Sequence, residues 1–68
     1  MTDVYEGVPH QLLRKPVRDI ASGSEGVLMA VLCENVSATG IEHWVDLAYI
    51  RLPSGLELST AVDNIEAA

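Results

Sequence analysis

The side chains that could bind a metal ion are few and widely spaced in this chain of 68 residues. Apart from the carboxylates, the candidates are His10, Cys33 and His43. Structural zinc sites use pairs of cysteines or histidines that lie only a few residues apart, and the sequence contains no such pair. We therefore interpret His10 as a loop residue and His43 as the start of a strand, and we expect neither a metal nor another cofactor.

Cys33 is the one candidate thiol nucleophile. A reactive cysteine needs a neighbouring base and a lowered pKa, but Cys33 ends the continuously apolar run 27–33. This position predicts an inert, buried thiol. Because it is the only cysteine, it cannot form a disulfide within the chain.

Acidic side chains are numerous, yet their setting argues against acid–base catalysis. Asp and Glu number 10 against 4 Lys and Arg, which gives a net charge of -6, and six of the acids follow residue 33. General acid–base catalysis needs a cleft that shifts carboxyl pKa values, and a domain of this size has little volume for one. We expect a solvated acidic surface, no catalytic residue and no enzymatic activity.

Asp46 is the exception among the acids, since it lies between apolar residues of a predicted strand. If its side chain points inward, it must be paired, and Arg18 and Arg51 are the available partners. In the alternative, Asp46 faces outward and Trp44 does so too.

Charge and length exclude several classes of partner. A net charge of -6 argues against binding nucleic acid, because cations must replace the counterions of the phosphate backbone. No apolar stretch approaches the roughly 18 residues that a membrane helix needs. The acidic N-terminus lacks the basic and apolar regions of a signal peptide. We expect a cytoplasmic protein without nucleic-acid or membrane partners.

The elements that must position these residues are short strands. Residues 1–16 contain two X-Pro steps and no sustained period. This predicts an irregular or extended arm that packs on the body or on a partner, and it allows one helical turn at 12–15. Val17–Ala21 alternates as a short strand. The run 27–33 has the length and β-branched content of a strand buried on both faces. Residues 41–52 allow a strand or a helix, and the β-branched and aromatic residues favour the strand.

The C-terminal third carries the clearest turn signal. In residues 52–56, Pro53 sets the first turn position and Gly55 supplies a left-handed one, which predicts a three-residue hairpin loop. Residues 56–62 then alternate as a half-buried strand. Asp63 is expected to cap a single turn, after which Ile65 enters the core.

This order of turns and strands resembles the small SH3-like barrels, including those with a KOW-type motif. Gly23-x-x-Gly26-Val27, followed by Val31, resembles their glycine turn and first strand. The segment AYIRLPSGLELSTAVDNIEAA (48–68) is similar to their C-terminal half, in which a single turn carries an apolar plug, here Ile65, into a terminal strand. The resemblance implies an all-β fold: an SH3-like barrel of about five strands at 17–68, preceded by the arm at 1–16.

Members of that family are peptide-binding modules, RNA- or ribosome-contacting KOW domains, or small accessory subunits. The chain departs from the first two groups, because its three aromatic residues do not form a recognisable peptide platform and its charge is acidic. Fold alone therefore assigns none of these roles.

Apolar content points instead to association. Val, Ile and Leu total twenty, more than the interior of one small barrel can hold, and exposed apolar patches mark interfaces. We expect a non-enzymatic interaction or accessory module that forms a homo-oligomer or docks on a partner protein. Trp44 is either a core residue or an interface anchor. The interface candidates are Tyr5, Leu12, Leu13, Trp44, Tyr49 and Arg51, of which Tyr49 and Arg51 share a strand face. The alternative is an acidic inhibitor or antitoxin-like protein, which requires one contiguous negative face.

Overall fold

The computed structural model describes residues 4–5, 7–36 and 40–68 and has an all-β architecture. Its strands are β1 (Val4–Tyr5), β2 (Pro16–Asp19), β3 (Glu25–Asn35), β4 (Trp44–Arg51), β5 (Glu57–Ala61) and β6 (Ile65–Ala67), with a 3-10 turn, η1 (Val62–Asn64), between β5 and β6. The all-β prediction is therefore confirmed. For residues 44–51 the strand interpretation is correct and the helical one is wrong.

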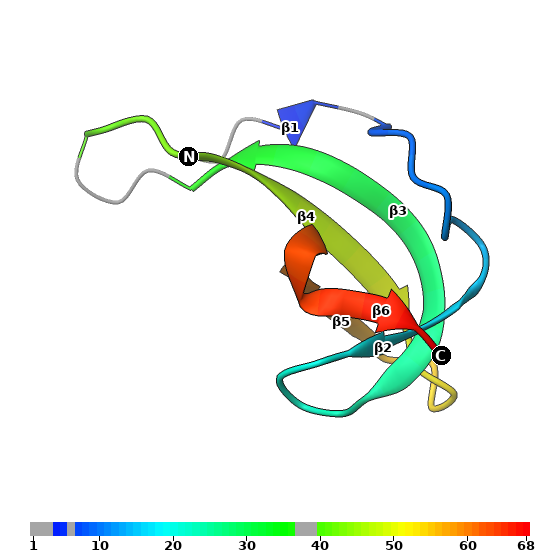
Figure 1. Cartoon of the computed structure of the whole chain (residues 1–68). Helices are drawn as coiled ribbons and strands as arrows, with labels where there is room; N and C mark the ends of the chain where they lie inside the picture. The colour runs from blue at the N-terminus through cyan, green and yellow to red at the C-terminus, as the bar shows by residue number, and fades with distance from the viewer. Residues whose placement is uncertain (1–3, 6, 37–39) are drawn as a thin grey trace.

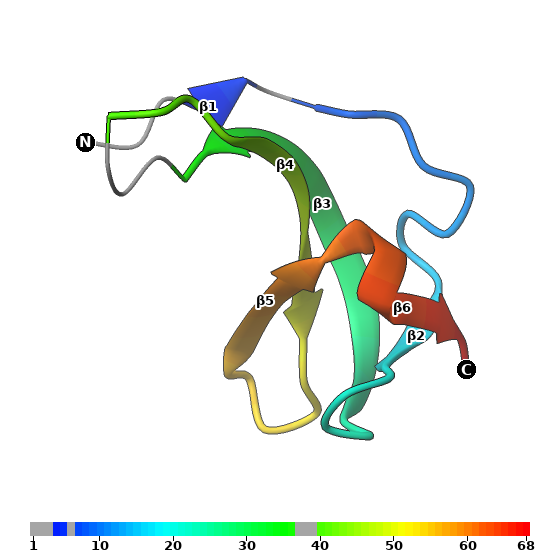
Figure 2. The same cartoon turned by 60° about the vertical axis from the view of Figure 1, so that its left-hand side comes forward.

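All strands belong to one antiparallel sheet in the order β5-β4-β3-β2-β6, and β1 pairs with the far end of β3 (Figures 1 and 2). β3 is the longest element and contacts β1, β2 and β4. β5 and β6 lie at opposite ends of the order, and no pairing joins them within the part of the chain that the structure describes. The sheet is therefore open.

The core lies on one face of this curved sheet. Its fully buried apolar residues are Val17, Leu28, Val31, Ala48 and Ile50. Ile65 packs against them, as predicted, and so do Leu12 and Leu13 from the N-terminal segment. That segment is not extended throughout, because consecutive turns are closed by hydrogen bonds from Leu13 N to His10 O (3.2 Å) and from Lys15 N to Leu12 O (3.0 Å).

Residues 27–33 of β3 are buried on one face rather than on both, so the expectation for this run is wrong. Leu28 and Val31 are buried, whereas Val27 is 38% exposed. The reason is that the structure describes a single curved sheet whose other face has no second layer against it. The pairing register with β4 shifts between Leu28 and Ala30, which marks a β-bulge, and bulges bend a strand and increase its twist.

Close packing and turn geometry account for two glycines. Gly26 lies in β3, where a Cβ atom would come within 2.3 Å of the Arg51 carbonyl oxygen. Gly55 has φ of 91° and its N–H donates to Leu52 O (2.9 Å), so the predicted hairpin loop is confirmed.

Asp63 lies inside η1, and the N-cap position belongs to Ala61 with no side-chain cap. Its predicted capping role is wrong.

Candidate interaction surfaces

The first candidate surface is the tip of the β3–β4 hairpin, which reaches away from the body of the molecule (Figures 1 and 2). Three large apolar side chains are exposed here: Val36 (45%), Ile41 (74%) and Trp44 (36%). We call these three residues the hairpin tip. Two hydrogen bonds hold the chain around them: Val36 N donates to His43 O (2.8 Å) and His43 N donates to Asn35 Oδ1 (3.2 Å).

Trp44 is half-exposed at the start of β4, opposite Asn35 of β3. Its indole N–H donates to the Glu42 carboxylate at 3.5 Å. With 36% of its surface exposed, Trp44 is not one of the buried core residues, so the core interpretation is wrong.

The second candidate is the outer face of the sheet, which faces away from the core. Cross-strand register aligns Ala30 with Tyr49 and Leu32 with Leu47 on this face. All four are half-buried. Tyr49 and Arg51 share the face, as the alternation predicts, and Arg51 forms an exposed ion pair with Glu57 (3.6 Å).

A buried carboxylate also lies on the outer face. Glu34 is 8% exposed, and the Tyr49 hydroxyl donates a hydrogen bond to it. This bond is the main reason that the pKa of Tyr49 is raised to about 12, with burial and the nearby negative charges adding to the effect. The hydroxyl thus remains protonated and anchors the long side chain across the face.

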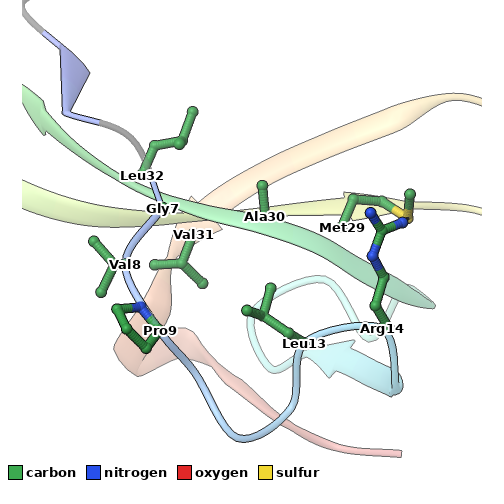
Figure 3. A pocket seen from close by; sticks show the side chains of 9 residues that line it. All are labelled: Gly7, Val8, Pro9, Leu13, Arg14, Met29, Ala30, Val31 and Leu32. Atoms are coloured by element: carbon green, nitrogen blue, oxygen red, sulfur yellow. The ribbon is translucent and has the colours of Figure 1, made fainter.

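The third candidate is an open apolar pocket of about 270 Å³ between the N-terminal segment and β3 (Figure 3). Val8, Pro9 and Leu13 line one side, and Met29 to Leu32 of β3 line the other. Arg14 stands at its end with φ of 66°, a left-handed conformation that non-glycine residues rarely adopt. Hydrogen bonds on both sides hold this turn: Arg14 N donates to Leu28 O (2.7 Å) and Leu28 N donates to Lys15 O (3.1 Å).

Asp19 forms a buried polar junction that the sequence reasoning missed. It is 4% exposed and accepts hydrogen bonds from the backbone and hydroxyl of Ser22 and from the Asn64 amide (2.6 Å). The bond from the Ser22 hydroxyl is the largest of the effects that lower the pKa of this carboxyl. The junction ties the β2–β3 loop to η1. Its signal in the sequence is that Asp19 shares a strand face with Val17.

Cys33 and Asp46 face each other across β3 and β4 on the core side of the sheet. Burial, and then the neighbouring Asp46 carboxylate, raise the pKa of the Cys33 thiol, which is the opposite of what a nucleophile requires. Asp46 thus points inward, but its predicted arginine partners are wrong. Arg18 pairs with Glu66 and Glu25, and Arg51 pairs with Glu57.

The interface candidates are dispersed rather than gathered at one site. Trp44 lies at the hairpin tip, Tyr49 and Arg51 lie on the outer face, and Leu12 and Leu13 pack against the core. The side chain of Tyr5 lies outside the described part of the structure, although its backbone pairs with Cys33.

Among the residues that the structure describes, no group of three or more His, Cys, Asp or Glu side chains could hold a metal ion. The Nδ1 atom of His10 instead accepts a hydrogen bond from Leu12 N (3.1 Å), which fits the predicted loop role. None of these residues forms a helix long and apolar enough to cross a membrane.

Comparisons with protein-family models, with curated proteins and with solved structures give no match to this chain.

Proposed function

We propose that this chain is a non-enzymatic interaction module that self-associates or docks on a partner protein. The observation that carries the proposal is a set of aliphatic side chains that one copy leaves exposed. Of the twenty Val, Ile and Leu residues in the sequence, the structure describes four as buried and seven more as partly buried against the core. Five are exposed, namely Ile20, Val27, Val36, Ile41 and Leu56. Apolar surface left outside the core favours association.

Self-association is tested by light scattering coupled to size exclusion, from low micromolar concentration upward. We expect the mass of a dimer or larger oligomer that dissociates on dilution. A mass that stays at one copy of the 7.3 kDa chain throughout the range would contradict self-association.

Docking on a different protein is the second arm of the proposal, and the hairpin tip favours it. Its three apolar side chains are presented at the end of a projecting hairpin, and one of them is Trp44, a residue type enriched among interface anchors. Affinity capture with the wild type and with Ile41→Ser tests this arm. Ile41→Ser should lose a partner that the wild type captures, and Gln11→Ser, an exposed change elsewhere, should retain it. Equal capture by all three would contradict a role for the tip.

For the fold, we propose an SH3-like arrangement in a partly open form. The support is the strand order β5-β4-β3-β2-β6, together with a single turn that leads into the last strand. Residues 7–15 pack on this body, which supports the division into an arm and a barrel-like domain.

The acidic-inhibitor alternative has less support from the charge distribution. Glu34 is buried, Glu57 is paired with Arg51, and Glu66 is paired with Arg18 on another strand. These three acids are buried or paired with arginines, so they add little to the contiguous negative face that such a protein would present to a basic partner.

A further inference from the structure

β5 is an edge strand whose outward backbone groups can be identified. Among the described residues it pairs only with β4. Leu52 N donates to Leu56 O (2.8 Å), and hydrogen-bonded residues recur at every second position of an antiparallel ladder. Leu58 and Thr60 therefore direct their backbone groups toward β4. Glu57, Ser59 and Ala61 direct theirs toward the open edge.

We propose that a second copy of this chain occupies that edge, with β5 pairing antiparallel to β5 about a twofold axis at Ser59. The inference rests on the proposed self-association and specifies its geometry. In this register Ser59 lies opposite Ser59 of the second copy, and Glu57 lies opposite Ala61. Each outward-directed residue thus meets another, so that their N–H groups and carbonyl oxygens pair. A twofold interface of this kind closes on itself.

The side chains agree with this register. Glu57 is placed opposite Ala61 and not opposite another glutamate, so directly opposed like charges, which destabilise a strand pair, are avoided. On the core-facing side, Leu58 lies opposite Thr60 of the second copy. Leu56, which is 68% exposed in one copy, directly precedes β5 and would lie beside the η1 turn of the second copy.

The edge carries few of the features that prevent strands from pairing. Proteins protect their edge strands with proline, charged side chains or a bulge. The segment ELSTA contains no proline or lysine, and its one charged side chain, Glu57, is paired with Arg51 of β4. Its register with β4 runs without a shift from Arg51↔Glu57 to Leu47↔Ala61. Glu57 is therefore the one residue of β5 that could oppose a second strand, and the proposed register places it opposite Ala61.

Ser59→Pro is the variant that should block pairing at the β5 edge and leave the rest of the fold intact. The N–H of Ser59 points away from β4, and proline is tolerated in edge strands where the N–H faces solvent. The variant should keep its circular dichroism and cooperative unfolding, but its dimer dissociation constant should rise by about 100-fold or more, because the central hydrogen-bonded pair is lost. Ser59→Ala is the matched control. It retains the N–H and should dimerise within about threefold of the wild type.

The register is tested by a pair of charge variants, which also serves if Ser59→Pro does not fold. Ala61→Lys places a cation opposite Glu57 of the second copy, and Ala61→Glu places a like charge there. At low salt the first should tighten the dimer about threefold and the second should weaken it by a similar factor. If both variants change the affinity equally, the register is wrong.

Sedimentation velocity on the wild type and these variants distinguishes self-association in general from self-association through β5. A wild-type dimer that Ser59→Pro dissociates supports β5 pairing. If folded Ser59→Pro dimerises as the wild type does, self-association stands but uses another surface, such as the hairpin tip, and the β5 inference is overturned. A monomeric wild type throughout the concentration range overturns both self-association and the β5 inference.

Discussion

The two ends of β3 differ in packing: its start is tightly packed, and its other end leaves apolar side chains exposed. At its start, the chain packs so closely that Gly26 has no room for a side chain against Arg51, and the buried Asp19 junction satisfies its polar groups internally. At its other end, the hairpin tip leaves Val36, Ile41 and Trp44 exposed. The first end is part of the packed body, and the second contributes little to the core and leaves apolar surface exposed.

In this contrast a charged residue, Asp19, is buried, whereas apolar residues at the hairpin tip are exposed. A buried carboxylate is favourable at Asp19 because several donors reach it. The exposed aliphatic side chains of Val36 and Ile41 at the tip contribute little to the core, and our proposal is that they contact a partner. Substitutions at the two ends should therefore affect different measurements.

The largest effect on stability is expected for Gly26→Ala, which breaks the tightly packed end. The new Cβ would lie 2.3 Å from the Arg51 carbonyl oxygen and 2.8 Å from Ile50 Cγ2, so that β3 and the end of β4 must separate. We expect a loss of about 3 kcal/mol or more in the free energy of unfolding, measured with urea.

Gly23→Ala is the control for this variant. Gly23 has positive φ but open space around its Cβ position, so the substitution should cost only about 1 kcal/mol. If Gly26→Ala is no more destabilising than Gly23→Ala, the close approach of β3 to Arg51 is not as described.

Asp19→Ala should have the next largest effect, because it leaves the Asn64 amide and the Ser22 hydroxyl without their shared acceptor. We expect the melting temperature of this small domain to fall by about 10 °C. Ser59→Ala, which removes an exposed hydroxyl on β5, should leave the melting temperature nearly unchanged.

The pH dependence of stability at this junction has a definite sign. The pKa of Asp19 is lowered in the folded state, so its contribution is present above the unfolded carboxyl pKa of about 4 and is lost as the pH falls through the folded value. Asp19→Asn should remove the part of the stability loss at acidic pH that is due to Asp19. If Asp19→Asn loses as much stability at acidic pH as the wild type does, other groups cause the loss.

Tyr49→Phe should destabilise moderately, by about 1–2 kcal/mol, because the buried Glu34 carboxylate loses its donor. In the wild type the Tyr49 pKa is raised to about 12. The contribution of this tyrosine is therefore fully present below pH 10 and is lost as the pH rises toward 12. Urea unfolding of both proteins at neutral and alkaline pH measures the difference, which should shrink at high pH.

Ile41→Ser should change stability least, by less than about 0.5 kcal/mol, because the side chain is 74% exposed. Ile50→Ala, at a fully buried isoleucine, should cost about 3 kcal/mol. A comparable loss from the two variants would mean that the hairpin tip belongs to the core.

The strands and turns were accessible from the sequence because their signals are local. The apolar alternation around Leu58 and the proline–glycine loop at 53–55 each depend on neighbouring residues. The separation of Trp44 from Tyr49 and Arg51 followed from strand parity alone.

Features that depend on contacts between distant segments could not be predicted from the sequence. The Asp19 junction joins residues 45 positions apart, and the bulge at Leu28/Ala30 is defined only by pairing with β4. The exposure of Trp44 depends on how far the hairpin extends past the body. The partners of Asp46 were missed because Arg18 and Arg51 find acids on neighbouring strands instead.

Amide hydrogen exchange at two protein concentrations tests the central claim, self-association through surface that one copy leaves open, most directly. The outward N–H groups of Glu57, Ser59 and Ala61 should exchange quickly in dilute protein and at least about tenfold more slowly in concentrated protein. The N–H of Gly23, bonded to Asp19 O at 2.7 Å, should be protected at both concentrations. Outward β5 amides that exchange equally fast at both concentrations would contradict the account.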